Sequence, residues 1–156
     1  MSQPTPSIPF TKMHGAGNDF VVLDGVSGEL PPLEPLAARL CDRHFGIGAD
    51  QVLVVRPSER ADFRMQIFNA DGSQAEMCAN GIRCFYAFVR SRGLTGAEEI
   101  GVETLAGVVR PRGAWPMCLL SAPPGGIVNV GHATTGRREV SADSAGRTTP
   151  KDRPRR

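Results

Sequence analysis

Apolar residues between positions 10 and 110 fall into short runs and alternating patterns that are typical of strands. Residues 52–56 are almost continuously apolar, whereas residues 63–68 alternate and place Met65 and Ile67 on one face. Strands are predicted at residues 10–13, 20–24, 52–56, 63–68, 99–103 and 107–110.

Two other segments have the spacing of helices. Residues 34–44 predict the first helix, which has Pro35 in its first turn and ends before Gly46. Its apolar stripe consists of Leu36, Ala37, Leu40 and Cys41. The second helix is predicted to begin near Ala79 or Asn80 and to end at Gly93.

The second helix is apolar on nearly every side, which is typical of a helix buried in the core. Cys78 directly precedes it. The first N–H groups of a helix have no partner within the helix, and they carry a partial positive charge. The pattern therefore points the positive end of a buried helix at a cysteine.

Glycine-containing loops separate these elements. Residues 14–19 hold two glycines, and Asn18 and Asp19 can bond either the loop backbone or a ligand, so a tight hairpin alone would also explain this loop. Residues 46–51 predict a flexible turn before a strand, and residues 69–72 predict another turn.

Composition narrows the class of protein. The chain has 156 residues, of which 40% are hydrophobic and 22% charged, as expected of a soluble globular protein with a sizeable core. No apolar run approaches the roughly 18 residues that span a membrane. The first nine residues do not resemble a secretory signal, so a cytoplasmic location is expected. The four cysteines are therefore expected to be thiols.

Charge is unevenly distributed along the chain. Residues 131–156 hold seven Lys or Arg against three Asp or Glu, whereas residues 1–130 hold eleven against thirteen. The basic segment has no interleaved aromatic residues and no recognised nucleic-acid motif. Nucleic-acid binding is therefore not expected.

The character of the sequence changes near Arg112, where Pro, Gly, Ser, Thr and Arg become frequent. Such a segment buries too little apolar surface to offset the entropy of ordering. We expect a disordered terminus at 1–8, a folded domain at 9–111 and an aberrant, disordered tail at 112–156. One apolar island in this tail either folds back or stays exposed: Trp115, Met117, Leu119 and Leu120.

Four motifs occur in order at residues 14–20, 46–51, 68–84 and 102–107. They read HGAGNDF, GIGADQ, FNADGS with EMCANGIRC, and VETLAG. Together they closely resemble the N-terminal half of diaminopimelate epimerase, over roughly residues 9–111. The resemblance implies an α+β fold in which each half is a curved sheet or barrel around one central helix.

The resemblance also implies an activity. Family members interconvert LL- and meso-diaminopimelate without a cofactor, for lysine and cell-wall precursor synthesis, and the family suggests a homodimer. Two cysteines act as acid and base on opposite faces of the α-carbon, and Cys78 matches the first of them. The family's substrate contacts match Asn18, Gln51, Asn69, Ala79 and Asn80. Ala79 replaces the usual glycine, which keeps the backbone N–H but adds a methyl group beside the substrate.

This chemistry suits the residues. A helix N-terminus favours a thiolate, and its N–H groups can bind the substrate α-carboxylate. Cys84, in the middle of the buried helix, is expected to be a core residue. The cysteines and histidines do not have the spacing of a zinc site, so no metal is expected.

The second half of the family pattern is missing. No second helix start of the CGNG or CGSG type occurs, and Cys118 lacks the flanking pattern. The change after Pro111 suggests a shifted reading frame or a truncated product. With one base, the isolated chain is expected to have negligible epimerase activity.

Two alternatives remain open. One is a non-catalytic remnant of the enzyme. The other is a related isomerase or racemase of the same fold, such as a proline racemase-like or phenazine-type enzyme, against which residues 14–20 argue.

Overall fold

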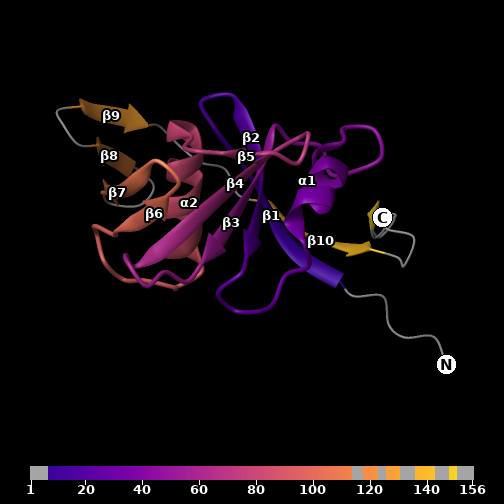
Figure 1. Ribbon diagram of the computed structural model, residues 1–156, viewed down its shortest axis with the longest axis horizontal. Coiled ribbons are helices and arrows are strands. Elements are labelled where there is room, and N and C mark those ends of the chain that lie inside the picture. Colours follow the sequence, from indigo (N-terminus) through magenta and orange to yellow (C-terminus); the bar gives the residue numbers. More distant parts are fainter. Residues whose placement is uncertain (1–6, 114–117, 123–125, 131–135, 143–147, 151–156) are drawn as a thin grey trace, which may run out of the picture.

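The computed structural model describes residues 7–113, 118–122, 126–130, 136–142 and 148–150, with side chains from Ile8 to Gly113. One mixed sheet carries two helices, α1 (Leu33–Cys41) and α2 (Ala79–Ser91) (Figure 1). The strands are β1 Ser7–Gly15, β2 Asn18–Asp24, β3 Gln51–Arg56, β4 Phe63–Asn69, β5 Gln74–Ala75, β6 Val102–Thr104, β7 Gly107–Arg112, β8 Cys118–Ala122, β9 Gly126–Val130, β10 Gly136–Ala142 and β11 Thr148–Pro150.

The sheet is curved but open. Its order is β11-β10-β1-β2-β3-β4-β6-β7-β8-β9, with β5 beside β4. The pairs β2–β3 and β4–β6 are parallel, and α1 and α2 lie within the respective connections. Among the described strands, β9 and β11 are the two ends of this order and do not pair. The fold is therefore the expected α+β arrangement, and because the sheet is not closed, the word barrel describes it only loosely.

Alternate residues of the central strands serve two core clusters. On β2, Phe20 and Val22 pack with α2, whereas Val21 and Leu23 pack with α1. β3 repeats this alternation over residues 52–55, all of which are fully buried. A strand covered on both faces is apolar at every position. This explains why residues 52–55 form a continuous apolar run.

The α2 cluster is the larger of the two, and it encloses the helix predicted to be buried. It consists of Met13, Phe20, Val22, Leu53, Val55, Phe63, Met65, Ile67, Ile82, Cys84, Phe85, Tyr86, Ala87, Phe88, Val89, Ile100, Val102 and Val109. Residues 81–89 of α2 are all buried, which confirms the prediction. The helix ends at Ser91, and Gly93 follows with a left-handed φ of 68°.

The first helix is shorter than predicted. It ends at Cys41 rather than His44, because Asp42 leaves the helical conformation. The Asp42 carboxylate accepts hydrogen bonds from the backbone N–H groups of His44 (2.7 Å) and Phe45 (2.8 Å). An aspartate that bonds the backbone ahead of it competes with helix continuation.

The strands also differ from the prediction at their ends. β1 and β2 are longer and meet in a two-residue turn at Ala16 and Gly17, which have φ of 49° and 93°. Residues 14–19 thus form a tight hairpin. β6 begins only at Val102, Glu99 contributes an isolated bridge, and the short β5 was not predicted.

Residues 112–156, predicted to be disordered, include the backbone of β8 to β11. The side chains of this tail beyond Gly113, and Trp115 and Met117 altogether, lie outside the described residues. The predicted domain limits at 1–8, 9–111 and 112–156 stay predictions.

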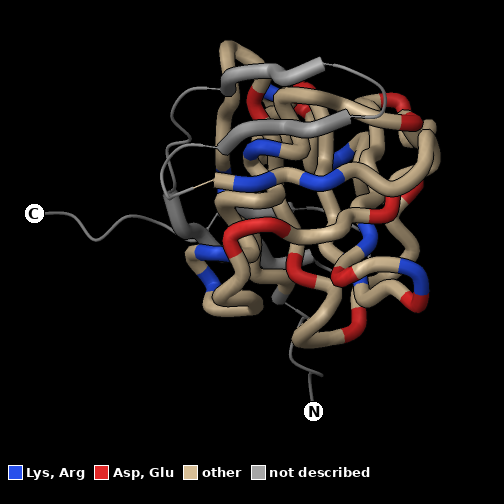
Figure 2. Tube along the Cα trace, turned by 90° about the vertical axis from the view of Figure 1, so that its left-hand side faces the viewer, with Lys and Arg blue, Asp and Glu red and all other residues tan. Residues whose placement is uncertain are grey.

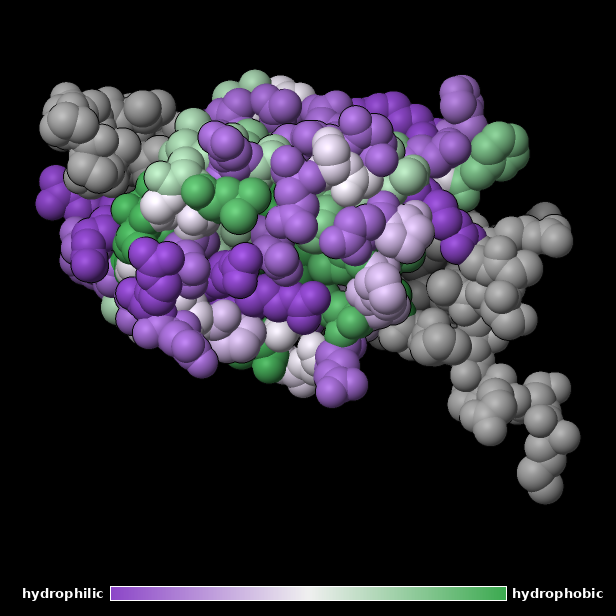
Figure 3. Space-filling model, viewed as in Figure 1, coloured by the Kyte–Doolittle hydropathy of each residue, from purple (hydrophilic) through white to green (hydrophobic). Residues whose placement is uncertain are grey.

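The described surface is mixed in character. Acidic and basic residues are interspersed along the chain (Figure 2), and hydrophilic side chains predominate on the face shown in Figure 3. The exposed large hydrophobic residues of the described part are Val26, Leu105 and Phe45, the last with 84% exposure. No helix within the described ranges is long and apolar enough to cross a membrane.

Gly46 provides a test of the packing behind α1. A Cβ atom here would overlap the carbonyl oxygen of Arg39 and lie 2.8 Å from that of Asp42. We expect Gly46→Ala to lower the free energy of unfolding by about 3 kcal/mol, because backbone cannot move aside cheaply. Gly28→Ala is the matched control, since an added Cβ there meets nothing within 4 Å. Urea unfolding of both variants measures the difference, and equal effects would contradict this account.

Candidate active site

Cys78 is the N-cap of α2, as predicted. Its backbone is extended (φ −140°, ψ 115°), and its Sγ accepts a hydrogen bond from the N–H of Gly81 at 3.4 Å. The thiol is half-buried. Ala79 is the first helical residue, and both residues pack partly against the α2 cluster. The structure thus places a partly accessible sulfur at the positive end of a buried helix.

Two amide pairs lie at the same edge of the sheet. Asn80 donates through Nδ2 to Oδ1 of Asn18 at 2.8 Å, which ties the start of α2 to the start of β2. Gln51 donates through Nε2 to Oδ1 of Asn69 at 2.8 Å, across the β3–β4 ladder. Because β2 and β3 are parallel and β4 runs back, both pairs lie where these strands begin or end.

One amide in this group has an unused acceptor. Oε1 of Gln51 is buried and has no hydrogen-bond partner among the described residues. Asn69 donates its Nδ2 to Oγ of Ser73 at 3.0 Å. A buried carbonyl oxygen without a partner costs free energy, which a ligand N–H group would recover.

A charged network that the sequence analysis missed lies beside these amides. Asp19 accepts hydrogen bonds from both terminal nitrogens of Arg43 (2.8 and 3.0 Å) and from Nζ of Lys12 (2.8 Å). Arg43 also donates to Asp50 at 2.9 Å. These bonds, with Arg43 first, hold the pKa of Asp19 well below its usual range, against the effect of burial. The sequence hint for this network was that Arg43 lies between two loops that each contain an aspartate.

The other described cysteines are core residues, as predicted. Cys84 is fully buried in the α2 cluster, and Cys41 is 4% exposed against α1. Burial raises the pKa of the Cys41 thiol to about 11. No group of three or more metal-ligating side chains comes together within the described residues.

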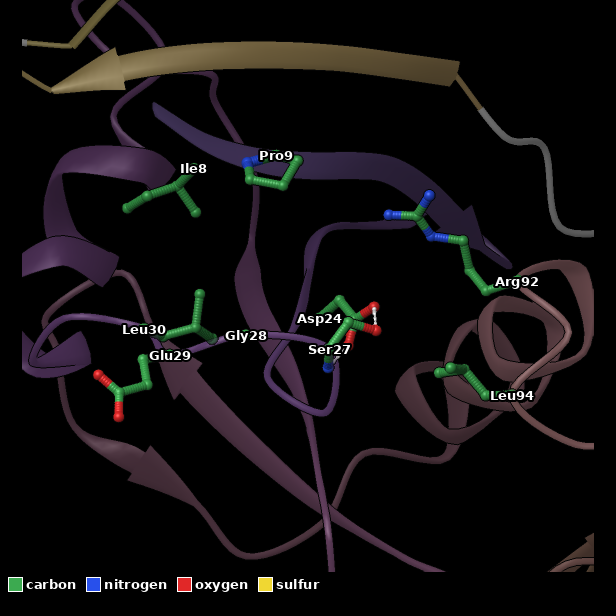
Figure 4. A pocket seen from close by; sticks show the side chains of 9 residues that line it. All are labelled: Ile8, Pro9, Asp24, Ser27, Gly28, Glu29, Leu30, Arg92 and Leu94. Carbon is green, nitrogen blue, oxygen red and sulfur yellow. Dashed lines mark hydrogen bonds between the residues drawn. The ribbon is translucent and has the colours of Figure 1, made fainter. Parts of the chain in front are cut away.

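A separate pocket of about 360 Å³ lies at the C-terminal end of α2, whereas Cys78 caps the N-terminal end. Arg92 and Leu94, just beyond this helix, line it together with residues of β1, the end of β2 and the loop after it (Figure 4). None of the predicted site residues lines this pocket, so the amide edge and Cys78 form a distinct candidate site.

Comparisons with known proteins give a consistent result. The family model for diaminopimelate epimerase matches residues 10–112. A diaminopimelate epimerase of Caldanaerobacter subterraneus is 59% identical over 102 residues, which cover 65% of this chain and 36% of that protein. One of Moorella thermoacetica is 56% identical over 104 residues, 66% of this chain and 37% of that protein. The chain thus spans little more than a third of these relatives.

Solved structures show the fold alone. A phenazine biosynthesis protein of the PhzF family from Bacillus anthracis has a TM-score of 0.60 at 20% identity and covers 74% of this chain and 40% of that one. A hydroxyproline epimerase from Agrobacterium vitis has a TM-score of 0.59 at 17% identity, over 78% of this chain and 42% of that one.

The position of Cys78 predicts selective alkylation. At pH 8, we expect iodoacetamide to label Cys78 at least about tenfold faster than Cys41 or Cys84, because burial keeps Cys41 protonated and shields both. Peptide mass spectrometry assigns the label to each cysteine and distinguishes labelling at Cys118 from labelling at the other three. Labelling in urea should remove the difference, and equal rates in the native chain would contradict the assignment.

The charge of Asp19 predicts a pH-dependent stability. Its depressed folded pKa contributes stability above the unfolded value of about 3.9, and this contribution is lost as the pH falls towards the folded pKa. Asp19→Asn should therefore cost about 1 kcal/mol at pH 7, the upper end for solvent-accessible pairs, and less at pH 3. Glu59→Gln, at an exposed position, is the control. Urea unfolding at both pH values checks this, and a constant difference would refute it.

Proposed function

This chain belongs to the diaminopimelate epimerase family, and we propose that it carries one half of an epimerase active site for diaminopimelate. The observation that carries the proposal is the half-buried Cys78 at the N-terminus of α2, a helix start that the Asn80–Asn18 bond ties to the sheet edge where the amide pairs lie. We also propose a cytoplasmic location, a reaction without a cofactor and, as the family suggests, a homodimer.

The chemistry requires a base on each face of the substrate. An α-proton beside a carboxylate is a poor acid, and inversion requires one group to remove the proton and another to deliver one to the opposite face. Cys78 acts as one base: its thiolate takes the α-proton and becomes a thiol, and the electron pair stays on the substrate. The helix N-terminus places the N–H of Gly81 3.4 Å from the Sγ of Cys78.

Binding would use the groups around Cys78. The N–H groups of Ala79 and Asn80, at the start of α2, stabilise the α-carboxylate as negative charge grows on it. The amides of Asn18, Gln51 and Asn69 orient the zwitterionic substrate without adding a net charge. Oε1 of Gln51, which has no hydrogen-bond partner in the described part of the chain, suits an ammonium N–H. The methyl group of Ala79 packs partly against the core, which supports its tolerance at this position.

The second base lies outside this half-site. The chain spans 36% of the length of a relative, and we place the second cysteine in the part that this chain does not match. With Cys78 alone, the chain exchanges a proton on one face but does not invert the centre. A non-catalytic protein is the alternative, and the same experiment separates the two.

The test is solvent exchange. In D₂O, the purified chain should replace the α-proton only at centres of one configuration, L or D, because Cys78 reaches one face, and should form negligible epimer. Cys78→Ala should slow this exchange by at least about 100-fold. Cys118→Ser is the control and should leave it unchanged. NMR measures exchange and chiral chromatography measures inversion.

Three outcomes are informative. Exchange without inversion supports the half-site. Substantial conversion of LL- into meso-diaminopimelate refutes the single-base proposal. Failure of the wild-type chain to exchange either isomer favours the non-catalytic alternative.

A further inference from the structure

We propose that Arg43 is a positioning residue, which holds the amide side chains of Asn18 and Gln51 in place by joining Asp19 to Asp50. This inference deepens the proposed function and rests on it for its link to catalysis. Its structural part concerns the amides alone.

The two aspartates form a reciprocal pair. The backbone N–H of Asp19 donates to Oδ2 of Asp50 at 3.1 Å, and the N–H of Asp50 donates to Oδ1 of Asp19 at 2.9 Å. The N–H of Asp50 is also 3.0 Å from the carbonyl oxygen of Asp19. Each carboxylate thus satisfies the backbone of the other loop.

This pair extends the sheet by one step. The parallel ladder of β2 and β3 begins at Phe20 opposite Gln51. Asp19 and Asp50 come just before these two residues, and their side chains continue the connection where the ladder stops. Asn18 precedes Asp19, and Gln51 follows Asp50. Movement of either aspartate would therefore shift a neighbouring amide.

Arg43 spans both carboxylates. Its Nη2 lies 2.8 Å from Oδ1 of Asp19 and 2.9 Å from Oδ1 of Asp50, while its Nη1 lies 3.0 Å from Oδ2 of Asp19. The planar guanidinium fixes distance and angle together, which a point charge does not. Without it, two carboxylates would face each other with Lys12 as the remaining cation that bonds Asp19.

The backbone around Arg43 is closely packed. Gly48 has a left-handed φ of 80°, and a Cβ there would lie 3.1 Å from Cα of Arg43. Lys12, on β1, also donates to the carbonyl oxygen of Gly48. The 46–51 loop is thus held against Arg43 from two sides.

Exposure separates positioning from plain stabilisation. The Arg43 side chain is 55% exposed and that of Asp50 is 41% exposed. Ion pairs this accessible contribute little to global stability. Loss of Arg43 should therefore change the melting temperature only slightly, while it changes the order of Asn18 and Gln51.

The test compares Arg43→Ala with Arg110→Ala, which removes an exposed arginine on β7. In ¹H–¹⁵N spectra of the full chain, Arg43→Ala should shift or broaden the side-chain amide signals of Asn18 and Gln51, and Arg110→Ala should not. The Cys78-dependent exchange of diaminopimelate should fall by about ten- to a hundredfold, as expected for misplaced binding groups. Added guanidinium, but not ammonium, should restore both the amide signals and the exchange rate of Arg43→Ala.

Several results would overturn the proposal. Unchanged Asn18 and Gln51 signals would do so, as would changes spread over the whole spectrum with a large loss of melting temperature. If Arg43→Ala fails to fold, Arg43→Lys replaces it, because lysine keeps the charge but lacks the planar guanidinium. The side-chain amide signals of Asn18 and Gln51 then decide in the same way. If the wild-type chain exchanges no diaminopimelate, the proposed function fails, while the amide signals still decide whether Arg43 positions them.

Discussion

The burial of α2 is the constraint on which the rest of this structure depends. Nine consecutive residues of the helix are buried, so apolar surface must meet it on every side. A flat sheet covers only one side of a helix, and the curved sheet of β1 to β4, β6 and β7 supplies the others. The first N–H groups of α2 have no partner within the helix and need acceptors outside it. Cys78 lies at this end of the helix and supplies its Sγ to the N–H of Gly81.

The same constraint decides where polar side chains gather. Inside the sheet, β2 and β3 are apolar on both faces, so polar groups can occur only where the strands begin or end. Asn18, Gln51 and Asn69 occupy those ends, and α2 begins beside them. A helix start and strand ends that meet at one edge give a polar rim beside an apolar core. The position of the candidate site therefore follows from the packing of α2 and the sheet.

The sequence predicted those features that depend on local pattern. The buried helix, its boundaries and the continuous run in β3 follow from apolar spacing, and the position of Cys78 follows from them. The predicted end of α1 was wrong. The hydrogen bonds from the Asp42 carboxylate to the following backbone N–H groups end the helix before the apolar periodicity does. Two features were not predicted because they depend on long-range contacts. Arg43 bonds a residue 24 positions away, and whether the sheet stays open depends on which strands pair. Hydrophobic pattern indicates which face of a strand is buried, not which neighbour it acquires.

Charged and neutral polar side chains have different roles at this edge of the sheet. A free carboxylate beside Cys78 would oppose a thiolate, and it would compete with a substrate carboxylate for the N–H groups of α2. The chain places two aspartates next to the site amides, yet binds both to Arg43, and one of them to Lys12 as well. Neutral amides therefore occupy the rim, and the charges that hold them are paired at the adjacent residue, after Asn18 and before Gln51. For a proposed zwitterionic substrate, this arrangement holds the amides in place without adding a net charge beside the reacting carbon.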